Sequence, residues 1–183
     1  MNGREAILER VRSALGPAPT VPEISRAYAR TGDGDLVARF VERVSDYRAT
    51  VHRSLDDLDL GGFVRAPGVE LDLRPDDPPL TVAELDALPG VVTGCAVAIA
   101  ETGTVVLDSS PACGRRALTL VPDRHVCLVR VDQIVATVPE ALAALDPRRP
   151  ITLVSGPSAT SDIELERVEG VHGPRQLDVV VLG

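Results

Sequence analysis

A polar segment near the end of the chain, SGPSATSDIELERVEGVHGP (155–174), gathers groups that could bind a ligand. It directly follows the apolar run ITLV, so its hydroxyl groups begin where a buried strand is expected to end. If a helix starts after this turn, its free backbone amides and the neighbouring hydroxyls could hold a phosphate or a carboxylate without any lysine. The candidate ligand-binding residues are Ser155, Gly156, Ser158, Thr160 and Asp162. The alternative, which is compatible with binding, is that Ser158 or Thr160 only caps the helix.

A second candidate site is the sequence ETGT, which lies in a tight turn between two apolar runs. Strand ends commonly line the ligand crevice of open α/β sheets, so Glu101 is a candidate nucleophile, general base or hydrogen-bond acceptor. Its neighbours Thr102, Gly103 and Thr104 are then candidate ligand-binding residues. The alternative is an ordinary β-hairpin, with Gly103 at positive φ and Glu101 in solvent or capping backbone amides, and a single motif favours this alternative.

The loop GVHGP places His172 between two glycines, just before the last apolar run. An imidazole there could carry a proton or donate to an anion near neutral pH, which makes His172 a catalytic candidate. A histidine in a loop is more often a structural hydrogen-bonding group, and neither His52 nor His125 has a supporting pattern. Asp162 and Glu164 form only a weak carboxylate pair, so no metal site is predicted.

These turns need strands to position them, and five short runs rich in valine and isoleucine supply the prediction. The runs are VVTGCAVAIA, TVVLD, HVCLVRV, ITLVS and LDVVVL. Continuous apolar strands indicate a sheet covered on both faces. The helical run PEALAAL and the capping box at Thr81 and Glu84 interrupt the strands, which predicts a mixed α/β fold with helices flanking a mostly buried sheet. The connection ETG is too short for a crossover, so some neighbouring strands must be antiparallel.

Two helices are predicted before the main sheet. The first covers MNGREAILERVRSALG, whose apolar residues have helical spacing, and the second runs from Leu36 to Tyr47 after a capping sequence, TGDGD. The stretch between them is rich in proline and glycine and is typical of a surface linker. We therefore expect residues 1–34 to form a helix and linker, and residues 35–183 to form a single α/β domain.

Composition excludes several classes of function. All 19 basic residues are arginines, and the formal net charge is −8 with an isoelectric point near 4.9. This charge disfavours nucleic-acid binding, and the lack of lysine excludes a P-loop lysine or a pyridoxal Schiff base. Cys95, Cys113 and Cys127 form no CxxC pair, so we expect no iron–sulfur cluster and no zinc in this chain. With no secretory leader and no membrane-spanning run, we expect a cytoplasmic protein.

Three segments resemble the lactate-utilisation (LUD, LutC-type) domain family: 92–108, 121–135 and 155–182. The motifs ETGT, SGPSxTxDIE and GVHGP carry the resemblance, and they occur here in order. The resemblance implies a fold like that of the NagB, RpiA and CoA-transferase group. It also implies a part in oxidising L-lactate to pyruvate alongside iron–sulfur partner proteins, with no cofactor in this chain. A homo-oligomer is compatible with it.

Two functional hypotheses follow. In the first, the chain is an accessory subunit of lactate oxidation that binds a small anion, such as lactate or a phosphorylated ligand. In the second, it is a CoA-transferase-like enzyme in which Glu101 attacks an acyl-CoA. A third option is an interaction module with purely structural turns. In the first hypothesis the Glu101 turn and the turn at 155–160 both bind the anion, and whether the two turns meet across one crevice is left open by the sequence.

Overall fold

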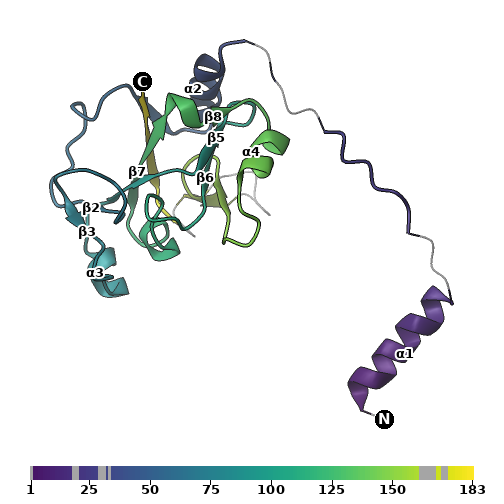
Figure 1. The fold of residues 1–183 in the computed structure, drawn as a ribbon. Coiled ribbons are helices and arrows are strands. Elements are labelled where there is room, and N and C mark those ends of the chain that lie inside the picture. Colours follow the sequence, from purple (N-terminus) through teal and green to yellow (C-terminus); the bar gives the residue numbers. More distant parts are fainter. Residues whose placement is uncertain (1, 18–20, 29–31, 33, 161–167, 170–172) are drawn as a thin grey trace.

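A six-stranded parallel sheet is the larger of two main sheets in the computed structural model, which describes residues 2–17, 21–28, 32, 34–160, 168–169 and 173–183 (Figure 1). Every pair of neighbouring strands in this sheet is parallel. In spatial order the strands are β1 (Thr50–His52), β12 (Gln176–Leu182), β7 (Arg124–Arg130), β4 (Val91–Gly94), β2 (Val64–Arg65) and β3 (Arg74–Pro75).

A four-stranded sheet lies beside it and carries both candidate turns. Its strands are β8 (Ile134–Val135), β5 (Val97–Ile99), β6 (Thr104–Leu107) and β9 (Thr152–Val154), in that order. β5 and β6 form the antiparallel hairpin that the short ETG connection predicts, and β9 pairs antiparallel with β6. The mixed α/β fold is therefore confirmed. One apolar run, VVTGCAVAIA, is divided between the two sheets, because β4 ends at Gly94 and β5 begins at Val97.

Both faces of the six-stranded sheet are covered by apolar side chains, as the continuous valine runs predict. Cys127 and Val179, on the adjacent strands β7 and β12, belong to one buried cluster. Val126 and Val180, one position away on the same strands, belong to another. Successive side chains of a strand point to opposite faces, so these two clusters lie on opposite sides of the sheet.

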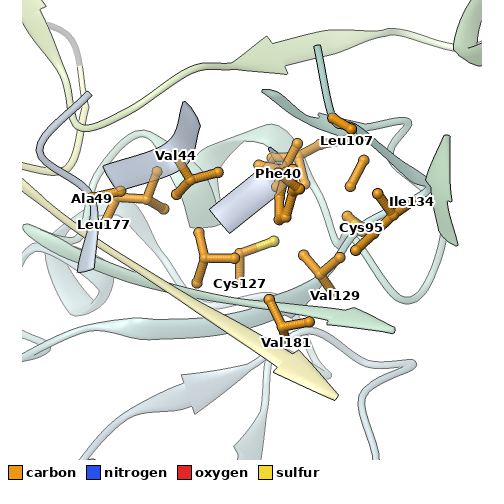
Figure 2. Close-up of a cluster of buried hydrophobic side chains, with 14 of the residues drawn as sticks. Phe40, Val44, Ala49, Cys95, Leu107, Cys127, Val129, Ile134, Leu177 and Val181 are labelled. Atoms are coloured by element: carbon orange, nitrogen blue, oxygen red, sulfur yellow. The ribbon is translucent and has the colours of Figure 1, made fainter. Parts of the chain in front are cut away.

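Helix α2 (Leu36–Asp46) covers the first of these clusters, with Phe40 and Val44 fully buried against it (Figure 2). The helix begins where the sequence predicts, because the Asp35 carboxylate accepts a hydrogen bond from the backbone amide of Ala38. The remaining short helices are α3 (Val82–Asp86), α4 (Val138–Ala144) and the 3₁₀ helices η1 (Arg116–Thr119) and η2 (Val131–Gln133). The predicted capping box of Thr81 and Glu84 is present at the start of α3.

The first helix, α1 (Gly3–Leu15), stands apart from the sheets (Figure 1). Asn2 and Glu5 form a capping box at its start, yet none of its side chains is buried. This arrangement agrees with a helix and linker ahead of the domain, although the boundary at residue 35 stays a prediction. In the part of the chain that the structure describes, no helix is long and apolar enough to cross a membrane.

Candidate functional site

The ETGT turn and the start of the polar segment at 155 lie side by side. Their contact follows from strand register: Val105 of β6 pairs with Val154 of β9 in antiparallel fashion, which brings Thr104 next to Ser155. The hydroxyl oxygens of Thr104 and Ser155 are 2.7 Å apart and share a hydrogen bond. The Thr102 hydroxyl lies 2.7 Å from that of Thr104 and extends the chain of hydroxyls. The two turns that the sequence singles out are therefore neighbours.

A glycine in each turn lets the backbone approach the end of helix α2. Gly103 has φ of 59°, and a Cβ there would lie 2.6 Å from the carbonyl carbon of Arg43. Gly156 has φ of 92°, and a Cβ there would lie 2.6 Å from the carbonyl oxygen of Tyr47. The hairpin interpretation of Gly103 is thus confirmed. Both turns therefore lie against the C-terminal end of α2, Gly103 beside Arg43 and Gly156 beside the capping residue Tyr47.

Replacing Gly103 or Gly156 with alanine is expected to lower the free energy of unfolding by about 2 kcal/mol each. The new Cβ meets backbone atoms that cannot rotate away, and the positive φ adds strain. Urea denaturation followed by circular dichroism measures the loss. Gly3→Ala is the matched control, because a Cβ at Gly3 meets no atom within 4 Å. Unchanged stability in both turn variants would contradict the packing described here.

The polar segment also lines a cavity of about 250 Å³ at the amino ends of β7 and β12. Residues 152–159 form one part of its lining, and Leu177 of β12 also contributes to it. Gly173 and Pro174, the end of the GVHGP loop, line it as well, and the Ser158 amide donates to the Pro174 carbonyl oxygen at 2.8 Å. The cavity therefore joins the segment at 155–158 with the described end of the GVHGP loop.

Arg116 supplies a positive charge to this cavity from helix η1. Its guanidinium donates to the Thr119 hydroxyl at 3.0 Å, and Thr119 lines the same cavity. No carboxylate of the described part of the chain pairs with Arg116. The preceding residue, Arg115, points elsewhere and binds the buried Asp76 carboxylate at 2.6 Å. Of two adjacent arginines, one anchors the loop and the other faces the cavity.

His125, near the start of β7, also lines the cavity and is only 2% exposed. Its Nε2 atom lies 2.7 Å from the Thr93 hydroxyl on β4. Burial, together with the nearby Arg116 cation, lowers the pKa of His125 to about 4. The imidazole is therefore neutral at pH 7. Among the described residues that line it, the cavity has one cation and one uncharged imidazole, besides the hydroxyl-bearing residues 119, 152, 155 and 158.

The other predicted site residues lie outside this cavity or outside the described residues. Glu101 is exposed, its amide donates to the Ala136 carbonyl oxygen at 3.1 Å, and it is not among the residues that line the cavity. Ser158 does not cap a helix, because strand β10 (Ala159–Thr160) follows it and pairs with β11 (Val168–Glu169). The backbone of residues 159–160 is therefore paired with that of residues 168–169, as in a strand. A helix capped by Thr160 would fall on residues 161–167, which lie outside the described residues. Asp162 and His172 lie outside the described residues.

Sequence reasoning missed Arg116, Thr119 and His125. One signal was available for His125, which stands in phase with the apolar Cys127 and Val129 along a strand and must therefore face the interior. A polar side chain at a buried position needs a hydrogen-bond partner, which can be another residue or a ligand. The sequence offers no comparable signal for Arg116, because nothing in it distinguishes Arg116 from the adjacent Arg115.

The three cysteines are buried and free of disulfide bonds. Burial raises the pKa of the Cys113 thiol to about 11, so this sulfur is protonated at neutral pH. Among the described residues, no group of three or more His, Cys, Asp or Glu side chains could hold a metal ion. The cysteines are therefore core residues in this structure.

Known proteins resemble this chain over most of its length. The LUD domain model matches residues 85–182. A protein of Deinococcus radiodurans named lactate utilization protein C is 46% identical over 93% of this chain and 87% of its own length. A protein of the same name from Shouchella clausii is 32% identical over 85% of this chain and 72% of its own. The crystal structure of a DUF162 family protein from Deinococcus radiodurans superposes with a TM-score of 0.64 at 40% identity, covering 81% of this chain and 96% of that one. This chain belongs to the LUD domain family.

Proposed function

We propose that this chain takes part in L-lactate utilisation as an accessory subunit, which binds a small anion and works beside iron–sulfur proteins that oxidise L-lactate to pyruvate. Two of its relatives carry the name lactate utilization protein C. Oxidising a hydroxy acid requires a carrier for two electrons. The cysteines of this chain are buried core thiols, so an electron-carrying cluster fits better on a partner protein.

The observation that carries the anion site is the placement of Arg116 at a cavity lined by hydroxyl groups. A guanidinium binds a carboxylate through two parallel hydrogen bonds, which adds orientation to the charge attraction. The rest of the chain is acidic, with a net charge of −8, so the cavity is a local cationic spot on an anionic protein. An anion would be drawn to this point in particular.

The chemistry available at the cavity is binding and orientation. Arg116 would pair with the anionic end of the ligand, and the Thr119 hydroxyl holds the guanidinium in place. The Ser155 hydroxyl is tied to Thr104, so the wall at 155–158 is fixed by the hairpin. A site of this kind can hold a small acid in one orientation.

Arg116→Ala is expected to weaken the binding of L-lactate by about ten- to hundredfold, because a charged hydrogen-bonding partner is lost. Titration calorimetry with the purified chain measures the change. Arg130→Ala is the matched control: it removes the same charge from the far end of β7, where Arg130 pairs with Asp132 at 2.9 Å. Equal loss in both variants would mean a general charge effect and would contradict a site at the cavity.

The subunit role has a test in cells that uses the same pair of variants. A strain that lacks this protein is expected to grow poorly on L-lactate, and the wild-type chain and Arg130→Ala should restore growth while Arg116→Ala should not. A tagged wild-type chain should also recover cysteine-rich iron–sulfur proteins from the lysate. Normal growth of the deletion strain together with no such partner would overturn the subunit role.

Acyl transfer through Glu101 is less well supported. The carboxylate is exposed on the hairpin and lies outside the cavity. None of the contacts described above prepares it for attack on a thioester. This alternative stays a prediction from the sequence.

A further inference from the structure

We propose that His125 is the second recognition group of this cavity, and that it selects acids with a hydroxyl or keto oxygen next to the carboxylate. In this arrangement Arg116 holds the carboxylate, and Nδ1 of His125 forms a hydrogen bond with the adjacent oxygen. The inference rests on the proposed anion site, and it adds to that site the chemical class of ligand: 2-hydroxy acids and 2-oxo acids, as opposed to plain carboxylic acids.

The first step in the argument is that His125 has one nitrogen left for a ligand. His125 is only 2% exposed, and its Nε2 is engaged with the Thr93 hydroxyl at 2.7 Å. Its Nδ1 has no hydrogen-bond partner among the described residues. In the described part of the chain no side-chain nitrogen or oxygen that is closed off from solvent lacks a hydrogen-bond partner, so Nδ1 of His125 is accessible from the cavity. Since His125 lines the cavity, a ligand there is the natural partner for Nδ1.

The second step is that the charges of the two groups differ. Arg116 is always a cation and suits a carboxylate. Burial and the Arg116 cation keep His125 neutral, so the cavity offers one positive charge and one uncharged hydrogen-bonding group. A singly charged acid with an uncharged oxygen nearby matches both groups. A phosphate dianion would find only one cation for its two charges.

The third step concerns the two forms of the neutral ring. If the Thr93 hydroxyl donates to Nε2, then Nδ1 carries the proton and donates to a hydroxyl or keto oxygen. If Nε2 donates to Thr93, then Nδ1 accepts, and only a hydroxyl can serve it. A hydroxyl suits either form of the ring, whereas a keto oxygen suits one. The site should therefore bind a 2-hydroxy acid at least as well as the matching 2-oxo acid.

A purely structural role for His125 makes a different prediction, and two substitutions separate the roles. Asparagine places a polar atom near the position of Nδ1, and glutamine can reach the position of Nε2 and keep the bond to Thr93. If His125 only supports β4, His125→Gln should behave like the wild type toward every acid. If Nδ1 forms a hydrogen bond with the ligand, His125→Asn should retain more lactate binding than His125→Gln.

The experiment is calorimetric titration of the full chain with L-lactate, with propanoate and with inorganic phosphate. Propanoate has the carbon chain and carboxylate of lactate but lacks the hydroxyl. We expect the wild type to prefer lactate over propanoate by about tenfold or more. His125→Gln should remove this preference, so that lactate and propanoate bind with equal affinity. Arg116→Ala should weaken both acids.

The possible failures are distinguishable. Equal binding of lactate and propanoate by the wild type would overturn the role of His125 and leave the anion site standing. Binding of neither acid would overturn the anion site and this inference together, and phosphate binding alone would identify a different ligand class and overturn the inference. The imidazole resonances of the wild type give a second measurement, independent of any variant: lactate should shift those of His125 more than propanoate does, and equal shifts would count against the inference.

Discussion

Replacing Arg115 with methionine is expected to lower the free energy of unfolding by about 3 kcal/mol at pH 7, because a buried carboxylate loses its partner. Asp76 is only 3% exposed. It accepts hydrogen bonds from Arg115 at 2.6 and 3.0 Å and from the Leu80 amide at 2.8 Å. The value is at the lower end for a buried pair, since the Arg115 side chain is 35% exposed and partly screened by water.

The pH dependence of this loss has a definite sign. Burial acts to raise the pKa of Asp76, but the hydrogen bonds from Arg115 and Leu80 outweigh it and hold the pKa below 3.8. In the wild type this stabilisation is present at neutral pH and is lost as the pH falls below about 3.8. Without Arg115, burial dominates and raises the pKa. The deficit of Arg115→Met should therefore be largest at pH 7 and shrink as Asp76 takes up a proton on acidification.

Denaturation of the single variants and of the pair measures this coupling. Adding Asp76→Asn to Arg115→Met should restore part of the lost stability, because no uncompensated charge remains in the interior. Arg148→Met is the matched control, since its partner Asp146 forms a surface pair and the Arg148 side chain is 89% exposed. A control loss as large as that of Arg115→Met would contradict the buried-pair explanation.

The same pair has a consequence for the cavity. Arg115 immediately precedes η1, so its hold on Asp76 fixes the start of the helix that carries Arg116. Lactate binding should weaken in Arg115→Met even under conditions where the variant remains folded. The buried pair thus links the stability of the loop to the position of the ligand-binding arginine.

Local signals in the sequence were enough for the short-range features of the fold. The ETG connection permits only a hairpin, and Thr81 with Glu84 satisfies the first amides of α3. Valine runs without polar alternation indicate strands buried on both faces, which β7 and β12 confirm. Each of these features depends on residues a few positions apart, where propensity and geometry decide the outcome.

Other features of the fold depend on strand pairing between segments that are far apart in the sequence, and these features could not be predicted from local patterns. β1 pairs with β12, so Thr50 lies beside Asp178. The break at Gly94 between β4 and β5 is imposed by two different sheets and has no strong local cause. Similarly, the segment after Ser158 has the hydroxyls of a helix cap, yet it pairs as β10 with β11. Here tertiary pairing overrode a local preference.

The candidate site likewise combines a contact between motifs that the sequence singled out with groups that could not be predicted from the sequence. Whether the two turns form one site is open from the sequence; Thr104 and Ser155 are in contact, but residues 101–104 are not among those that line the cavity. The group that supplies the charge was not predicted, because Arg116 and His125 approach the polar segment only through the assembled sheet. Their relevance depends on a cavity whose walls come from residues 116 to 177. A short sequence motif does not show which distant residues will line a cavity.

Acidification from pH 6.5 to about pH 4 is expected to destabilise the protein by about 3 kcal/mol through His125 alone. The folded ring has its pKa lowered to about 4, chiefly by burial and then by Arg116, while Asp178 on the neighbouring strand acts in the opposite direction. An unfolded chain takes up a proton on this histidine near pH 6.5, whereas the folded chain does not. The stabilisation from the neutral ring is thus full above pH 6.5 and is lost as the pH falls toward 4.

Two measurements check this expectation. The imidazole resonances of His125 should show no titration between pH 8 and pH 5, and a midpoint near 6.5 would contradict a buried neutral ring. His125→Gln, which does not ionise, should lose less stability than the wild type over the same acid range, since carboxylates elsewhere in the chain titrate in both proteins. A neutral ring also implies that Arg116 stays the single cation of the described cavity lining across the physiological range. Lactate affinity should therefore stay nearly constant from pH 8 to pH 6, where an ordinary histidine would strengthen anion binding as it gained its charge.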